Sequence, residues 1–201
     1  ALPFGGDTLT ELAEELHLTN VWDAYFAGRA AALGRVPAEV VHALFYNFFP
    51  GEVARHLPRV WTVTTPEAAF AAREDGCVRA LRRRLGEVAA TDAVARTADL
   101  LARAALSAPT EGRAMYAALR SRPLPEESLA RLFQAACLVR EHRGDGHIAV
   151  LVGEGIGGTE CHFLAALADG IPGAEFGRVH HRPRAELDAI ESGLRDRGLL
   201  D

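Results

Sequence analysis

The sequence predicts an all-α fold, arranged as an orthogonal bundle of many helices. Helix start and stop signals recur along the whole chain, and apolar residues repeat at spacings of three and four. No segment shows the sustained alternation of apolar and polar residues that indicates a sheet. The chain therefore places its chemistry on helices and on the turns between them.

Composition favours a globular protein without a membrane span. The 201 residues are 49% hydrophobic and 24% charged, with no apolar run of the ~20 residues that a spanning helix needs. The N-terminus lacks the features of a signal peptide, so we expect a cytoplasmic location. The three cysteines lie in apolar helical patterns and are expected to be free thiols. A net charge of −5 disfavours extensive non-specific binding of nucleic acid.

Capping residues, prolines and glycines divide the first 125 residues into helices. Thr8 and Glu11 have the spacing of a capping box, Asn20 and Thr65 are expected caps, and Gly34 is expected to end a helix. The expected helices are 8–17, 21–33, 37–49, a short one that ends near Trp61, 66–85, 92–107 and 110–120. Residues 122–125 form the clearest linker.

The remainder predicts one long apolar stretch followed by three short helices. A helix from Glu126 runs into a polar block, and helices are then expected at 160–168, after Pro172, and at 184–197. Thr159 is the expected cap of the first of these three. Three short helices with tight turns predict a helix-turn-helix-like unit. We therefore divide the chain into residues 1–155, which carry the polar site, and residues 156–201.

Residues 140–147, Arg-Glu-His-Arg-Gly-Asp-Gly-His, are the densest chemistry in the sequence. They lie between the apolar runs 129–139 and 148–152, so their charges must find partners close to a core. Gly144 is expected to end one helix and Asp145 to cap the next. A solvated corner between helices is the alternative, but such a corner does not need two arginines, a glutamate and two histidines.

The block predicts a site that binds a small organic molecule and transforms it by acid/base chemistry, as an isomerase, lyase or hydrolase does. His142 would titrate near neutrality, Asp145 would orient it, and His147 would supply a second imidazole. The expected ligand-binding residues are Arg29, Tyr46, Asn47, Glu141, Arg143 and Glu160. The arginines would hold an anionic group, and the glutamates would be their partners.

We expect no nucleotide cofactor. The glycine-rich residues 152–158 match neither the dinucleotide fingerprint nor a Gly-Lys-Ser/Thr ending, so they are expected to form a loop. A metal site is the weaker alternative, with His142, His147 and His162 as ligands. On an unbroken helix the first two would be separated by ~140° around the axis, so this site needs the break at Gly144.

Several segments resemble an actinobacterial family of SalK-like helix-turn-helix proteins. They are residues 25–34, 45–48, 112–113 and, most specifically, 140–147. The resemblance implies the helical architecture and a role in specialised, natural-product metabolism. It also implies a further N-terminal helix before the segment that matches Trp22, where this sequence has only a short replacement. After the equivalent of residues 198–201 it implies a β-hairpin wing and a terminal helix, which this sequence does not contain.

A ligand-responsive transcriptional regulator is the alternative function. Residues 20–155 would then sense a small molecule, and residues 159–201 would contribute to DNA binding through Arg178, His180, His181, Arg182 and Arg184. A second copy of the chain is a candidate partner in either case. A purely structural role is favoured only if residues 140–147 are fully exposed.

Overall fold

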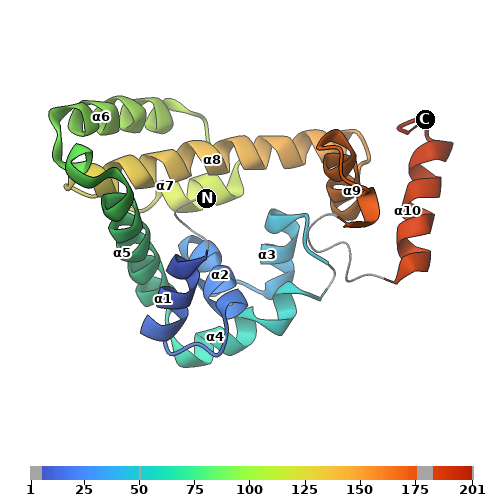
Figure 1. Ribbon diagram of the computed structural model, residues 1–201, viewed down its shortest axis with the longest axis horizontal. Helices are drawn as coiled ribbons and strands as arrows, with labels where there is room; N and C mark the ends of the chain where they lie inside the picture. Colours follow the sequence, from blue (N-terminus) through green and yellow to red (C-terminus); the bar gives the residue numbers. More distant parts are fainter. Residues whose placement is uncertain (1–5, 50, 176–182, 201) are drawn as a thin grey trace. The chain divides into compact units, whose positions relative to one another are not determined.

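The computed structural model describes residues 6–49, 51–175 and 183–200. Within these ranges the chain forms ten α-helices, four short 3₁₀ helices and no β-strand, which confirms the all-α class (Figure 1). The chain divides into two compact units, Ala1–Leu44 with Gly51–His147 and Phe45–Pro50 with Ile148–Asp201. The division after residue 155 that we inferred from the sequence concerns function and stays a prediction.

Most elements that begin in the first unit have the ends that the sequence predicts. The elements that begin there are α1 Asp7–Glu15, α2 Val21–Ala30, η1 Ala31–Leu33, α3 Ala38–Phe45, η2 Val53–Arg55, α4 Leu57–Val63, α5 Pro66–Leu85, η3 Gly86–Ala90, α6 Asp92–Ser107, α7 Ala114–Arg120 and α8 Ser128–Gly153. The Asn20 side chain accepts hydrogen bonds at the start of α2, and Thr65 does so at the start of α5. Gly34 and Gly86 take positive φ where their helices end, as expected of stop signals.

Three predicted helix boundaries in the first 125 residues are wrong. Helix α1 begins after Gly6, and Thr8 is buried inside it, so the capping box is absent. Helix α3 ends at Phe45 because Tyr46 adopts a φ of 56°, which interrupts the helix before residue 49. Helix α7 begins at Ala114, several residues later than expected.

One core cluster of the first unit is built on helices α5, α6, α7 and α8. Tyr116 of α7 is fully buried there, and its hydroxyl donates to the carbonyl oxygens of Ala105 and Ala108 at 2.6 and 3.0 Å. The buried members of this core cluster are Cys77, Val78, Ala89, Val94, Ala105, Tyr116, Leu119, Leu129, Phe133, Cys137 and Leu138. This packing fixes the face that α7 and α8 present to each other.

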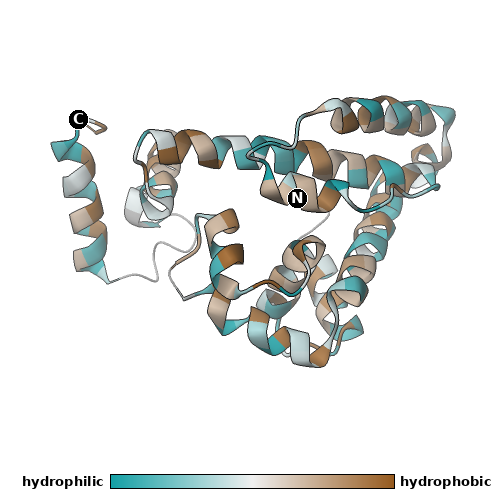
Figure 2. Ribbon diagram, turned by 180° about the vertical axis from the view of Figure 1, so that it is seen from behind, coloured by the Kyte–Doolittle hydropathy of each residue, from teal (hydrophilic) through white to brown (hydrophobic). Residues whose placement is uncertain are grey.

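The second unit combines the last residues of α8 with α9 Gly158–Ala168, η4 Gly173–Glu175 and α10 Arg184–Asp196. The expected cap at Thr159 is wrong: α9 follows Gly157, whose amide donates to the Glu160 carboxylate at 2.7 Å. Helix α10 does begin after Pro183 and carries both hydrophobic and hydrophilic residues along its length (Figure 2). Leu187 and Leu194 are its buried residues.

Two glycines of the second unit allow close packing. A Cβ atom on Gly158 would lie 2.1 Å from the carbonyl oxygen of Tyr46, and one on Gly173 would lie 2.5 Å from the Phe163 ring. Residues 154–157 form a loop, which is shorter than the predicted loop of residues 152–158, and Gly155 there takes a φ of 65°. The glycines of this region therefore serve packing and turns.

Candidate functional site

The polar block lies inside α8, which runs without interruption from Ser128 to Gly153. The predicted helix break at Gly144 is therefore wrong. Gly144 and Gly146 both keep helical backbone, and a Cβ atom on Gly146 would lie 1.8 Å from Nη1 of Arg113. The Arg113 guanidinium passes over this glycine and donates to the carbonyl oxygen of His142 at 3.1 Å. Gly146 makes room for a neighbouring side chain and does not form a hinge.

An unbroken helix separates the predicted catalytic side chains. Asp145 is buried and His142 is half-buried, whereas His147 is exposed. His142 and His147 are ~140° apart around the helix axis, so they cannot face one cavity. Arg143 is also exposed. The structure brings together Glu141, His142 and Asp145 on the inner side of α8, and their catalytic roles stay a prediction.

Glu141 forms a buried ion pair with Arg29 of α2. The Arg29 Nη2 atom lies 3.4 Å from Oε2 of Glu141, and both side chains are nearly inaccessible, with exposed fractions of 13% and 10%. Arg29 also donates to the Tyr25 hydroxyl at 3.0 Å. Burial would lower the pKa of Arg29, but Tyr25 and Glu141 outweigh it and raise that pKa above its usual value. The second oxygen of Glu141 pairs with Arg140.

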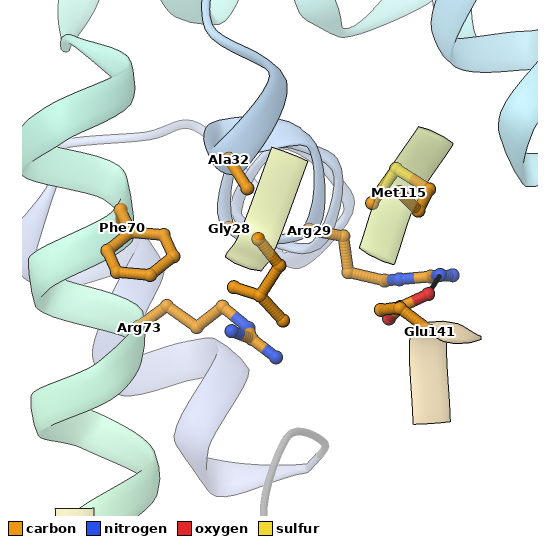
Figure 3. A pocket seen from close by; sticks show the side chains of 8 residues that line it. Gly28, Arg29, Ala32, Phe70, Arg73, Met115 and Glu141 are labelled. Carbon is orange, nitrogen blue, oxygen red and sulfur yellow. Dashed lines mark hydrogen bonds and ion pairs between the residues drawn. The ribbon is translucent and has the colours of Figure 1, made fainter. Parts of the chain in front are cut away.

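The Arg29–Glu141 pair lies at the edge of a small cavity in the first unit. Figure 3 shows Arg29 extending toward the Glu141 carboxylate, with Phe70 and Arg73 entering from α5. The cavity is lined by Gly28, Arg29, Ala32, Phe70, Arg73, Met115, Leu119 and Glu141. Its volume of about 10 Å³ has room for one water molecule. In this conformation an organic ligand could enter only if a lining side chain moved.

Asp145 supports the start of α7. Its Oδ2 atom accepts from the Tyr116 amide at 2.9 Å, and the Met115 amide is a second donor. These amides are among the helix-terminal donors that lack an intrahelical partner. Burial raises the pKa of the Asp145 carboxyl, and the two amides partly offset this. The carboxylate therefore caps a helix.

His142 contacts the same tyrosine edge-on. The two rings have centroids 5.0 Å apart at an angle of 83°. The Nε2 atom of His142 is buried and has no hydrogen-bond partner among the described residues. A buried ring nitrogen without a partner is costly for folding, which makes His142 the strongest remaining candidate for chemistry in the block.

Three further predicted residues belong to the second unit and have local partners there. The Tyr46 hydroxyl donates to the carbonyl oxygen of Ile156 at 2.5 Å, and the Asn47 side chain lies 3.2 Å from Nε2 of His162. Glu160 pairs with Arg197 at 2.9 Å as well as holding the start of α9. These contacts stabilise the loop and helix start around residue 157.

The sequence interpretation missed a buried cluster around Asp23 in the first unit. The Asp23 carboxylate is 2.7 Å from Nδ1 of His56 and from Nη2 of Arg59, and it accepts from the Thr19 hydroxyl at 2.7 Å. The His56 ring stacks on Phe26 with centroids 4.8 Å apart. Burial would raise the pKa of the Asp23 carboxyl, but these hydrogen bonds outweigh it and hold that pKa below its usual value. An acid among the apolar residues at the start of α2 was the available signal.

Within the part of the chain that the structure describes, no three His, Cys, Asp or Glu side chains come close enough together to hold a metal ion. The alternative metal site of His142, His147 and His162 thus stays a prediction. No helix in the described ranges is long and apolar enough to cross a membrane.

Comparison with known proteins places this helical architecture in a family. The model of a helix-turn-helix family matches residues 4–201, so the chain belongs to that family. No curated protein gave a significant match, and neither did any solved structure.

Proposed function

We propose that the chain is a DNA-binding regulator whose second unit contributes the DNA contacts. The observation that carries this proposal is the family match, which extends over residues 4–201 and includes α9, η4 and α10. Helix-turn-helix proteins place one helix of such a unit in the major groove and use neighbouring basic residues to hold the phosphates.

The charges of the second unit restrict where phosphates can bind. Among its described arginines, Arg184, Arg195 and Arg197 form ion pairs with Asp188, Glu191 and Glu160. The basic residues Arg178, His180, His181 and Arg182 precede α10 and lie outside the described residues. We expect this stretch and the first turn of α10 to supply the phosphate contacts.

Fluorescence anisotropy with a promoter fragment from the chain's own genetic neighbourhood tests this function. Binding should be detectable at about 50 mM salt and weaken steeply toward about 200 mM, because phosphate contacts release counterions. The double variant R178A/R182A should reduce the slope by about two units, one for each contact. R103A removes an exposed charge from α6 and should leave the slope unchanged. Absence of binding at the lower salt concentration would refute the proposal.

The Arg29–Glu141 cavity supports a second function, in which the first unit senses a small molecule. Desolvation offsets most of the stability that a buried ion pair gives, so a buried pair beside a cavity favours a role in specificity or switching. Acid/base transformation of that molecule is a narrower proposal that depends on His142, because His147 is exposed and Asp145 caps α7.

The finer family assignment is also a proposal. Residues 45–48 and 140–147 support a place in the SalK-like, actinobacterial branch of the helix-turn-helix family, with a ligand from specialised metabolism. A homodimer would suit such a regulator, since paired half-sites on DNA reflect a two-fold symmetric protein.

A further inference from the structure

More arginine than carboxylate side chains line the cavity of the first unit. The side chains that line it include two arginines, Arg29 and Arg73, and one carboxylate, Glu141. A third arginine, Arg140, binds the same carboxylate from the exposed side of α8. Arginines that share one carboxylate in a region of low dielectric favour a second anion.

Glu141 pairs with two arginines, one buried and one about half exposed. Its distance of 3.4 Å to Arg29 is longer than the ~2.8 Å of a good charged hydrogen bond. The other Glu141 oxygen pairs with Arg140, whose side chain is about half exposed. The carboxylate can therefore transfer fully to Arg140 without losing all its ion pairs, which would leave Arg29 open to another anion.

Arg73 presents a second guanidinium to the same cavity. It is buried on α5, its Nη2 atom lies 3.4 Å from Sγ of Cys137, and its guanidinium carbon lies 5.3 Å from the centroid of the Phe133 ring. Arg73 also interacts electrostatically with Glu74, the acid that follows it on α5. Phe70 and Met115 supply apolar walls beside the two arginines.

We propose that this cavity binds the carboxylate group of a small organic acid between Arg29 and Arg73, and that Glu141 is the internal competitor of that ligand. When the acid binds, Glu141 moves to Arg140 and the one-water cavity enlarges. The proposal deepens the sensor role of the first unit and rests on it. Binding is measured on the protein alone, so a failure to bind DNA does not affect the outcome.

Saturation-transfer NMR on the 201-residue protein at neutral pH, with acetate and formate as probes, measures this binding. E141Q removes the competing charge and should tighten acetate binding about tenfold, the change that one charged hydrogen bond gives. R140M should weaken acetate binding severalfold, because Glu141 then has only Arg29 as a partner. R96M removes an exposed arginine of α6 outside the cavity and should behave as wild type.

The opposite effects of E141Q and R140M distinguish internal competition from a general effect of charge. Equal weakening by R140M and R96M, or acetate binding no tighter in E141Q, would overturn the proposal. If E141Q does not fold, as judged by helicity, R140M and its control decide alone, since both change exposed residues. Sodium chloride should displace acetate less effectively than formate does; equal displacement would assign the site to any small anion and overturn its assignment to carboxylates.

Discussion

At the scale of single residues, two glycines of α8 differ by what surrounds them. A Cβ atom on Gly144 would be 3.8 Å from the Glu141 carboxylate, an ordinary contact, whereas one on Gly146 would overlap the Arg113 guanidinium. Arg113 can move away only by giving up its bond to the His142 carbonyl oxygen. The same residue type is thus replaceable at one position and required two positions later.

Alanine at these two positions should change stability in opposite directions. G144A should raise the free energy of unfolding by about 0.5–1 kcal/mol, because alanine is the better helix former. G146A gains the same propensity but loses a charged hydrogen bond, so we expect a net loss of about 1 kcal/mol. Urea unfolding of both variants measures the difference. Stabilisation by both would contradict the role assigned to Arg113.

Asp23 should dominate the local response to acid. Its folded pKa lies below the unfolded value, so its stabilising contribution is complete above the unfolded pKa and is lost as pH falls through the folded pKa. D23N should lower the free energy of unfolding at neutral pH by about 1.5–3 kcal/mol, the value of a charged hydrogen bond. Below pH ~4 the variant should lose less stability than wild type does. Parallel acid profiles for the two proteins would show that folding does not lower the pKa of Asp23.

At the scale of elements, α7 depends on α8 for its start. This helix has no cap from its own N-terminal side chains, and the Asp145 carboxylate of α8 receives its first amides instead. A short helix gains most of its stability from such tertiary contacts. The catalytic role predicted for Asp145 must therefore be separated from its capping role.

Substitution of Asp145 separates these roles. D145A should lower the free energy of unfolding by about 1–2 kcal/mol, the usual value of a lost cap, and should speed hydrogen exchange at the Met115 and Tyr116 amides. D145N keeps an acceptor oxygen and should retain most of the stability. E154A removes an exposed acid beyond the end of α8 and should change stability by less than about 0.5 kcal/mol. Unchanged exchange in D145A would rule out the cap.

The sequence predicted elements well where one residue decides the outcome locally. Asn20, Thr65 and Gly86 act within one turn of the chain, so their effects on helix ends could be foreseen. The need for glycine at position 146 could not be predicted in that way, because it comes from contact with Arg113, which is distant in the sequence. The cluster of Asp23 with His56 and Arg59 joins residues that are distant in sequence, so the local signal of an acid among apolar residues could not identify its partners.

At the scale of the whole molecule, the second unit has more acidic residues than arginines. The second unit contains nine acidic residues and five arginines, and each of its arginines in the described residues has an acidic partner. Such a surface binds nucleic acid only where basic residues are locally concentrated, as they are in residues 178–184. The candidate ligand residues Arg29 and Glu141 lie in the first unit.

Backbone amide NMR of the 201-residue protein during titration with the promoter duplex at low salt tests the DNA-binding function most directly. The account predicts that shifts concentrate in residues 159–200, strongest around the start of α10, with the cavity residues Arg29 and Glu141 unaffected. An absence of shifts, or shifts confined to the first unit, would contradict it.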